Sequence, residues 1–234
     1  MTTKHVSNKT SKKQELSEFL GKANQLPQRL VDSVNSNGRI IFALDATASR
    51  QASWDRACQL QSEMFSATDT MGGIQLQLCY YRGFNEFNFS PWLQDSNALR
   101  HFMHGVQCQG GHTQLEQVLN HSLREHADKA IQALIIITDA VEEDVDRLCN
   151  KAGQMGIMKI PIFIFQEGFD PTAQRCFQQL AKISNGAYAN FNDQSAKQLA
   201  DLLAAVATYA AGGHSALQKL NSSSAKQLLQ QLRP

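Results

Sequence analysis

Two dense apolar runs, each ending at an acidic residue, constrain the fold of this 234-residue chain more than any other feature. The first covers residues 39–44 and is followed by Asp45; the second covers residues 133–137 and is followed by Thr138 and Asp139. Runs without polar alternation are typical of parallel strands that are buried on both faces. In an open α/β sheet, the carboxyl ends of such strands form the ligand site. The sequence therefore predicts a polar site where these two strands end.

Hydroxyl side chains extend this candidate site into a set of oxygen donors. The set consists of Asp45, Thr47, Ser49, Thr113 and Asp139. Carboxylate and hydroxyl oxygens suit Mg²⁺, with Mn²⁺ or Ca²⁺ as alternatives, and they suit zinc or copper poorly. Taken singly, each residue is explained as well by helix capping or turn formation. The metal interpretation depends on all five meeting at converging strand ends.

Strands and helices are expected to alternate along the chain. Strands are predicted at about 39–44, 74–81, 84–89, 132–137, 160–165 and 187–191, and helices at about 14–34, 51–67, 95–106, from 113, from 142, 171–183 and 195–210. Arg82-Gly83 is typical of a tight hairpin turn, which makes the short third strand antiparallel. The predicted fold class is α/β, with a three-layer, doubly wound, mostly parallel six-stranded sheet.

Three regions are expected along the sequence. Residues 1–36 form a polar tail with a helical extension, residues 37–212 form the α/β domain, and residues 213–234 form a C-terminal helical extension. The Gly212-Gly213 pair separates the last two regions. We expect both extensions to pack on the outside of the domain or to contact a partner.

Composition narrows the class of function. The formal net charge is +1 and hydrophobic residues make up 42% of the chain, which favours a globular protein without attraction to nucleic acid or anionic lipid. No apolar stretch reaches the length of a membrane span. The five cysteines are widely spaced and include no CxxC pair, so neither disulfides nor a zinc knuckle is indicated. We expect a soluble, cytoplasmic protein.

Several side-chain positions are also predicted. A solvated first helical turn is expected for the acidic residues Glu142, Glu143, Asp144 and Asp146; the alternatives are an adjacent cation site or repulsion of acidic competitors. Gly153 and Gly156 are expected to mark the end of that helix. His121 and His126 are expected at the surface.

The oxygen donors follow a recognisable order. Asp45, Thr47 and Ser49 form an Asp-x-Thr-x-Ser pattern after the first strand, Thr113 lies in a middle loop, and Asp139 follows the fourth strand. This pattern resembles the metal-ion-dependent adhesion site (MIDAS) of von Willebrand factor A (VWA) domains, over roughly residues 37–212. Two positions depart from the family.

Thr47 stands where many members have serine, which keeps the oxygen on a stiffer side chain. Ala140 follows Asp139 where glycine is common, so this loop is strained if the position needs a positive φ.

The resemblance, to a bacterial-type cytoplasmic member, implies how the site works. The three hydroxyls would bind Mg²⁺ directly, and the two aspartates would act partly through water. The open position would then bind an Asp or Glu side chain of a partner protein. The loops Arg50–Trp54, Gln107–His112 and Val141–Asp144 would select that partner, with Trp54 either an exposed anchor or a core residue. The oligomeric state stays open.

The sequence also allows alternatives to this protein-binding module. A metal-dependent phosphohydrolase or nucleotide-dependent enzyme could use the same site, although the sequence has no GxxxxGK[ST] loop and no GxGxxG after the first strand. A degenerate domain that binds no metal is a third hypothesis. A zinc site built on His101, His104 and His112 is weaker, because no cysteine or carboxylate completes a convincing set.

Overall fold

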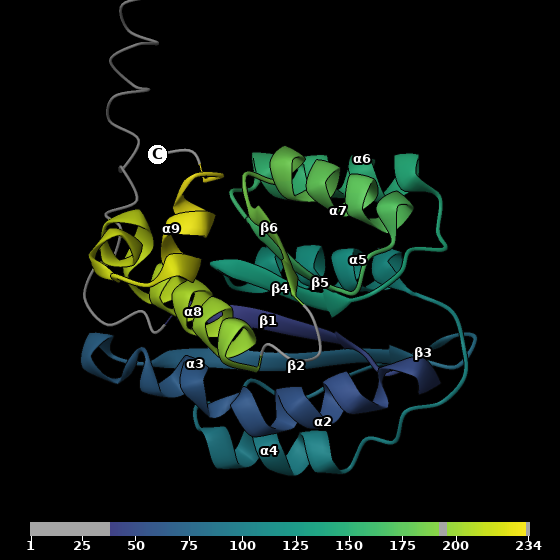
Figure 1. Cartoon of the computed structure of the whole chain (residues 1–234), viewed down its shortest axis with the longest axis horizontal. Coiled ribbons are helices and arrows are strands. Elements are labelled where there is room, and N and C mark those ends of the chain that lie inside the picture. The colour runs from purple at the N-terminus through teal and green to yellow at the C-terminus, as the bar shows by residue number, and fades with distance from the viewer. Residues whose placement is uncertain (1–37, 192–195, 233–234) are drawn as a thin grey trace, which may run out of the picture. The chain divides into compact units, whose positions relative to one another are not determined.

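A six-stranded sheet forms the centre of the structure, a computed structural model that describes residues 38–191 and 196–232 (Figure 1). The expected helix at about 14–34 lies outside the described residues. The strands are β1 (Gly38–Asp45), β2 (Ile74–Arg82), β3 (Glu86–Phe89), β4 (Ala133–Thr138), β5 (Ile162–Glu167) and β6 (Ala187–Phe191). Their order is β3-β2-β1-β4-β5-β6, and β3 alone is antiparallel to its neighbour. The predicted α/β sheet is therefore confirmed.

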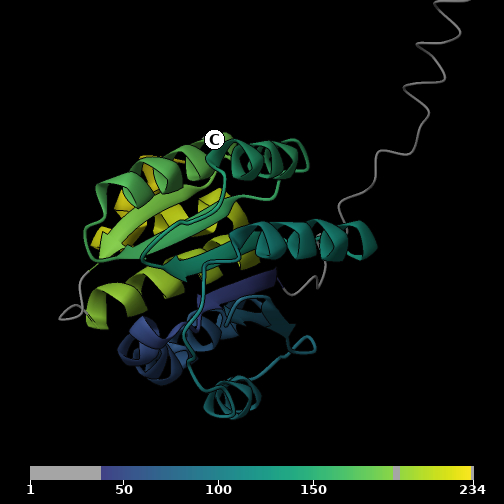
Figure 2. The same cartoon turned by 90° about the vertical axis from the view of Figure 1, so that its right-hand side faces the viewer.

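Helices cover both faces of this sheet (Figure 2). They are α2 (Gln51–Leu60), α3 (Ser62–Ser66), α4 (Ser96–His104), α5 (Leu115–Asp128), α6 (Val145–Ile157), α7 (Pro171–Ile183), α8 (Ala196–Lys219) and α9 (Ser223–Leu229), with short 3₁₀ helices η1 (Ala48–Arg50) and η2 (Asp69–Met71). One apolar cluster joins the sheet to α2, α3, α4, α8 and α9, and a second joins it to α5, α6 and α7. This arrangement is the three-layer architecture that the alternating pattern predicts.

The side-chain pattern of β1 shows why its residues 40–44 are all apolar. Ile40 and Phe42 belong to the first cluster, whereas Ile41 and Ala43 belong to the second. All four are fully buried. Because successive side chains of a strand point to opposite faces, a strand that is covered on both faces has no position for a polar residue.

The order of the strands determines where a ligand site can form. β1 pairs in parallel with β2 on one side and with β4 on the other, and Leu44 lies opposite Ile137. The chain therefore winds outward in both directions from the β1–β4 pair. Loops that leave neighbouring strands in opposite directions open a crevice at the carboxyl edge of the sheet. Asp45 and Asp139 lie at that crevice.

Two expected boundaries are wrong in an informative way. Gly153 and Gly156 lie inside α6, which continues to Ile157. A Cβ on Gly156 would come 2.5 Å from the carbonyl oxygen of Ile183, at the end of α7. Gly156 therefore allows two helices to approach closely. It does not end the helix, as its position in the sequence suggested.

The helix predicted at 51–67 is two helices, α2 and α3, which meet at Gln61. The turn after β2 is also longer than expected. Arg82 pairs with Glu86, so the connection contains residues 83–85, and Gly83 has a φ of 60°. This three-residue turn brings Phe84 out into solvent, where it is 79% exposed.

His121 is buried, contrary to the prediction that it lies at the surface. It is 3% exposed, and its Nε2 lies 2.8 Å from Oε1 of Gln77 on β2. Its ring also packs 4.3 Å from that of Phe89 on β3. Burial lowers the pKa of His121, partly opposed by the negative charge of Glu125. The sequence pattern of α5 missed this position because its polar partner, Gln77, lies on another element, 44 residues away.

The C-terminal region folds against the same sheet. Helix α8 is interrupted at Gly213, whose φ of 69° and ψ of −167° turn the chain. Beyond this kink, Leu217, Leu228 and Leu232 are buried in the first apolar cluster. Of the helices in residues 38–191 and 196–232, none is both long enough and apolar enough to span a bilayer.

Side-chain amides cover the outer edge of β6. The amide of Gln231 accepts from the backbone N–H of Tyr188 and donates to its carbonyl, both at 2.9 Å. Nε2 of Gln198 donates to the carbonyl of Asn190 at 3.1 Å. An edge strand otherwise presents unpaired N–H and C=O groups to other chains. These glutamines occupy such groups with neutral partners.

Candidate metal site

Asp45 is a buried carboxylate at the end of β1, with 4% of its surface exposed. Its Oδ1 accepts from the backbone N–H of Thr47 at 2.8 Å. Its Oδ2 lies 3.4 Å from the Tyr81 hydroxyl and 3.3 Å from the Thr138 hydroxyl. Burial raises the pKa of Asp45, the hydrogen bonds from Thr47 oppose this effect, and the nearby charge of Asp139 adds to it. A cation in the crevice would offset this cost of burying a negative charge.

Thr47 and Ser49 lie in the tight turn that connects β1 to α2. The N–H of Arg50 donates to the carbonyl of Thr47 at 2.9 Å, which closes the 3₁₀ turn η1. Oγ1 of Thr47 lies 3.4 Å from Oγ of Ser49. Adjacent ligands of an octahedral Mg²⁺ are about 3 Å apart, given metal–oxygen distances of about 2.1 Å. The two hydroxyls therefore have a separation that suits neighbouring positions on one ion.

Thr113 reaches the site from the loop before α5. Its hydroxyl donates to the carboxylate of Glu143 and accepts from the N–H of Glu142 at 3.0 Å. Its own N–H donates to Oε2 of Glu142 at 2.9 Å. A hydroxyl oxygen has two lone pairs, so one remains available for a metal after these bonds are formed.

The acidic residues before α6 are not a solvated helical turn, as the sequence suggested. The helix begins at Val145, and Oδ1 of Asp144 caps it by accepting from the N–H of Arg147 at 3.0 Å. Glu142 and Glu143 therefore lie in the preceding loop, where they hold Thr113. The sequence pattern did not indicate this role, because Thr113 is 29 positions from Glu142 and 30 positions from Glu143.

Asp139 follows β4 and faces Arg50. Its Oδ2 lies 3.4 Å from Nη1 of Arg50, and about a third of its side chain is exposed. The next residue, Ala140, is not strained, because Lys159 and Asn185 are the non-glycine residues with positive φ among those described. The loss of the common glycine therefore leaves the loop unstrained here.

The five predicted residues line one cavity of about 180 Å³ at the carboxyl edge of the sheet. Its complete lining is Asp45, Thr47, Ala48, Ser49, Gly110, Gly111, Thr113, Asp139, Ala140 and Glu142. The structure thus brings together carboxylates and hydroxyls from three separate loops. Such a set fits a hard divalent cation.

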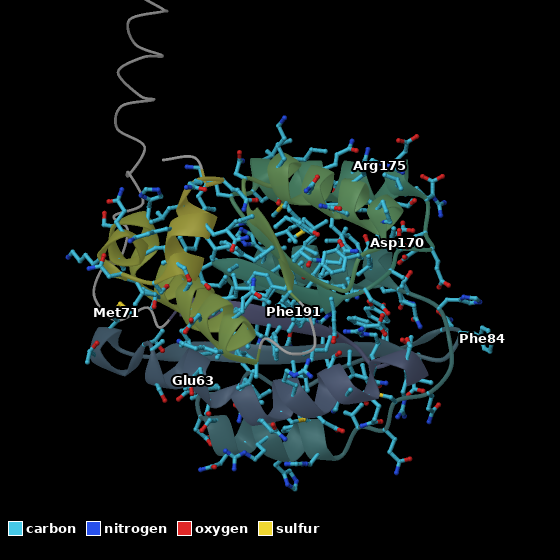
Figure 3. The ribbon with its side chains drawn as sticks, in the orientation of Figure 1. Glu63, Met71, Phe84, Asp170, Arg175 and Phe191 are labelled. Carbon is cyan, nitrogen blue, oxygen red and sulfur yellow. The ribbon has the colours of Figure 1, made fainter. Side chains whose placement is uncertain are left out.

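Gly111 lines the cavity and also lets the loop that carries Thr113 pack closely against a neighbouring turn. A Cβ at this position would lie 1.9 Å from the carbonyl oxygen of Gly83, in the turn after β2. The N–H of His112 donates to the same oxygen at 3.0 Å. The Thr113 loop is therefore fixed against the turn that carries Phe84. Phe84 and Asp170 mark one side of the molecule in Figure 3, the side on which β2 and β5 end.

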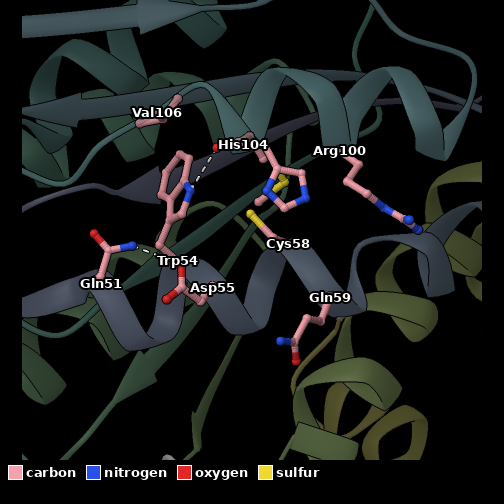
Figure 4. A pocket seen from close by; sticks show the side chains of 9 residues that line it. Gln51, Trp54, Asp55, Cys58, Gln59, Arg100, His104 and Val106 are labelled. Carbon is pink, nitrogen blue, oxygen red and sulfur yellow. Dashed lines mark hydrogen bonds between the residues drawn. The ribbon is translucent and has the colours of Figure 1, made fainter.

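A larger cleft of about 610 Å³ lies between α2 and α4 and shares no lining residue with the smaller cavity (Figure 4). Trp54 lines it, is 2% exposed, and donates from Nε1 to the carbonyl of Met103 at 3.1 Å. Trp54 is therefore a core residue and not an exposed anchor. Within the part of the chain that the structure describes, no three His, Cys, Asp or Glu side chains gather as a metal site. The zinc hypothesis for the three histidines has no support.

Comparison with solved structures shows which fold this arrangement represents. The SpRpn10 VWA domain matches with a TM-score of 0.56 over 71% of this chain and 95% of that chain, at 13% identity. The vWF domain of the type V pili tip protein Mfa5 from Porphyromonas gingivalis matches with a TM-score of 0.54 over 74% and 95%, at 10% identity. This chain has the von Willebrand factor A fold.

A third VWA-fold structure carries a metal. Proximal thread matrix protein 1 from the mussel byssus, with a zinc-occupied MIDAS motif, has a TM-score of 0.57 over 74% of this chain and 46% of that chain, at 13% identity. Neither a protein-family model nor a curated protein sequence matches this VWA-fold chain. Identities this low establish the fold alone, so the chemistry must be argued from the residues themselves.

One group beside the site was not predicted from the sequence. Arg50, directly after the Asp-x-Thr-x-Ser pattern, is 5% exposed and donates to Oγ of Ser53 at 2.7 Å and to the carboxylate of Glu167. Arg56 lies 3.5 Å from the other oxygen of Glu167. Glu167 ends β5, 117 residues from Arg50. The signal that could have indicated an ion-pair partner within the chain is a long charged side chain in a buried turn.

Proposed function

We propose that this VWA domain is a non-enzymatic protein-binding module whose Mg²⁺ site binds an Asp or Glu side chain of a partner protein. The supporting observation is the single cavity lined by Asp45, Thr47, Ser49, Thr113 and Asp139. The three hydroxyls would hold the ion directly, and the two aspartates would act partly through water, with Mn²⁺ or Ca²⁺ as alternative ions. The bound ion would supply one open, electrophilic coordination position.

The chemistry around the cavity favours binding over catalysis. Of the described residues that line it, none is a histidine, cysteine or lysine, so a general base would have to be a carboxylate. Asp45 is hydrogen-bonded at both oxygens, and Glu142 is committed to the loop of Thr113. An ion held mainly by neutral hydroxyls keeps much of its charge and attracts an external anion.

The first test is whether the protein binds metal. Thermal unfolding in a metal-free buffer, titrated with Mg²⁺ and then with Mn²⁺, should show a rise in melting temperature, since a ligand that binds only the folded state stabilises it. The shift should be absent in the Asp45→Asn variant. A wild-type protein without any shift at millimolar metal would leave only the hypothesis of a domain that has lost its metal.

The second test concerns the partner. Affinity purification with wild type and Asp45→Asn, each with Mg²⁺ or with a chelator, should recover a partner only with wild type in Mg²⁺. Equal recovery under all four conditions would contradict the proposal. Assays of the same preparations for Mg²⁺-dependent phosphatase or nucleotidase turnover address the enzymatic alternative, which requires turnover that Asp45→Asn abolishes.

The cytoplasmic location is part of this proposal. All five cysteines are free: Cys58, Cys79 and Cys176 are buried, and Cys108 and Cys149 are half-buried. Burial raises the pKa of Cys58 and that of Cys176 to about 11, so both thiols stay protonated and unreactive at neutral pH. These features suit a reducing compartment. The test is the redox state of the cysteines in folded protein purified from its native source. A disulfide there would contradict the cytoplasmic location.

A further inference from the structure

Arg50 is a buried cation placed directly beside the candidate metal site. Its backbone follows Ser49, and its Nη1 lies 3.4 Å from Oδ2 of Asp139. The other side of the guanidinium donates to Glu167 and to Ser53. An arginine keeps its charge in proteins, so a fixed positive charge shares Asp139 with any ion in the cavity.

The charges around Arg50 balance among themselves. Asp139 and Glu167 carry two negative charges, and Arg50 and Arg56 carry two positive charges, at N–O distances that define ion pairs. Asp45, by contrast, contacts hydroxyl and amide groups in this structure, and no described residue forms an ion pair with it. Arg50 therefore offsets the charge of Asp139 by a direct ion pair, and it acts on Asp45 only from a greater distance.

The pairing of Arg50 with Asp139 reduces the negative charge that the two aspartates present to the cavity, which has two consequences. A divalent cation is held less tightly, because attraction grows with the charge of its ligands. The bound ion also keeps more of its positive charge, so it attracts an external carboxylate more strongly. Glu142 and Glu143 accept hydrogen bonds from Thr113 and from the backbone beside it, keep their own charges, and contribute equally in every variant compared below.

We propose that Arg50 tunes this site, pairing with Asp139 so that the metal binds weakly alone and more tightly together with a carboxylate from a partner. This role rests on the proposed metal site. Arg50 is a positioning residue here, because it acts through Asp139 and is not itself a ligand.

The direction of change separates this role from a merely structural one. Replacing Arg50 by methionine should tighten metal binding by about tenfold, because Asp139 regains its full charge. Damage to the fold would weaken binding instead. Glu167→Gln should have the opposite effect, since it leaves Arg50 with more unbalanced charge beside the site. Arg50→Lys, which keeps the charge, should remain close to wild type.

Two further variants serve as controls for this test. Arg56→Met removes a cation from the same cluster that contacts Glu167 and forms no ion pair with Asp139, so it should change metal affinity less than Arg50→Met does. The double variant Arg50→Met with Glu167→Gln avoids leaving Glu167 buried with too few partners. It should bind metal more tightly than Glu167→Gln alone. This variant keeps the test usable if Arg50→Met folds poorly.

The measurement is a titration of each folded variant with Mn²⁺, with free Mn²⁺ followed by electron paramagnetic resonance and folding checked by circular dichroism. Failure of wild type to bind Mn²⁺ would remove the proposed metal site itself. Binding by wild type, with tighter binding by Arg50→Met, supports the role of Arg50. The role would be overturned if Arg50→Met bound Mn²⁺ no more tightly than wild type and the double variant bound it no more tightly than Glu167→Gln.

Acetate serves as a probe for the external carboxylate. At constant ionic strength against chloride, and corrected by a titration without protein, acetate should tighten Mn²⁺ binding to wild type. The same acetate concentration should have a smaller effect on Arg50→Met, because the ion there is already better neutralised. An equal acetate effect in the two proteins would refute the coupling.

Discussion

The outer edge of β6 and the carboxyl end of the central strand β1 satisfy their polar groups in opposite ways. At the outer edge of β6, the N–H and carbonyl of Tyr188 both bind the neutral amide of Gln231. At the carboxyl end of β1, the buried charge of Asp45 is surrounded by hydroxyl and amide donors. The first region is complete within the chain. The second is hydrogen-bonded but keeps a net charge, and burial raises the pKa of its carboxyl group.

This difference helps to separate structure from function. A neutral polar group that finds a neutral partner contributes stability and needs nothing further. A buried charge without a counter-ion costs stability, so its presence points to a ligand that is bound during function. Where the chain supplies its own counter-ion, as Arg50 does for Asp139, the cost is reduced and the affinity for the ligand falls with it.

The largest expected effect is that of Asp45→Asn on metal binding. The amide keeps the shape of the side chain and removes its charge, so Mn²⁺ affinity should fall by about a hundredfold or more. Asp55→Asn, on the exposed face of α2 and outside the cavity lining, is the matched control. Equal metal affinities for the two variants would erase the contrast between the two regions.

Next in size is the loss of stability in Gln231→Ala. Truncation leaves the N–H and carbonyl of Tyr188 without their partner, at a cost of about 1–3 kcal/mol in the free energy of unfolding. Metal affinity should not change. Gln230→Ala, whose side chain forms no hydrogen bond with β6, should cost about 0.5 kcal/mol or less. Urea unfolding measures both, and similar losses would show that the amide bonds to β6 do not matter.

A smaller effect is expected from Tyr81→Phe, which tests the hydroxyl donors around Asp45. Removing the hydroxyl 3.4 Å from Oδ2 leaves Thr138 as the nearest hydroxyl donor, so the carboxylate is less well held in its charged form. Mn²⁺ affinity should fall about fivefold, equivalent to about 1 kcal/mol. Tyr80→Phe, on the next position of β2, is the control. Unchanged affinity in Tyr81→Phe would show that Asp45 needs no support from this side.

The smallest effect is a pH dependence at His121, which is buried against β2 and β3 and lies outside both regions. Burial lowers the pKa of His121, with Glu125 opposing and Arg124 adding to the effect. Below about pH 6.5, the unfolded state therefore binds a proton that the folded state excludes. The free energy of unfolding should fall as the pH drops from 6.5 toward the lowered pKa of His121. In His121→Gln it should fall less over the same range.

The control for this last prediction is His101→Gln, an exposed position on α4. Urea unfolding between pH 7 and pH 5 should give His101→Gln the same slope as wild type and His121→Gln a shallower one. If all three slopes coincide, His121 does not contribute to acid sensitivity.

Much of the fold was predictable because the signals for it are local. The apolar runs of β1 and β4 indicated strands buried on both faces, and Pro171 indicated the first residue of α7. The end of each run placed Asp45 and Asp139 at the same edge of the sheet. Five side chains predicted as metal ligands from their order in the sequence line one cavity, and their role as ligands stays a prediction.

The partners of these residues could not be predicted, because they are distant in sequence and ordinary in type. Glu142 and Glu143 gave the pattern of a helix start, yet they hold Thr113. His121 gave the pattern of a surface residue, yet it is covered by β2 and β3. Local periodicity reports which face of an element is apolar, but it does not report what another element places against a polar side chain.

The sequence by itself therefore determined the strands, their burial and the oxygen donors at their ends. It could do so because a strand covered on both faces has a continuous apolar run, and because loop residues follow directly after their strands. Only the tertiary structure decided which charges are balanced. The pairing of Arg50 with Glu167 and Asp139 depends on β5 lying next to β4, and that neighbour relation is set by the winding of the whole sheet.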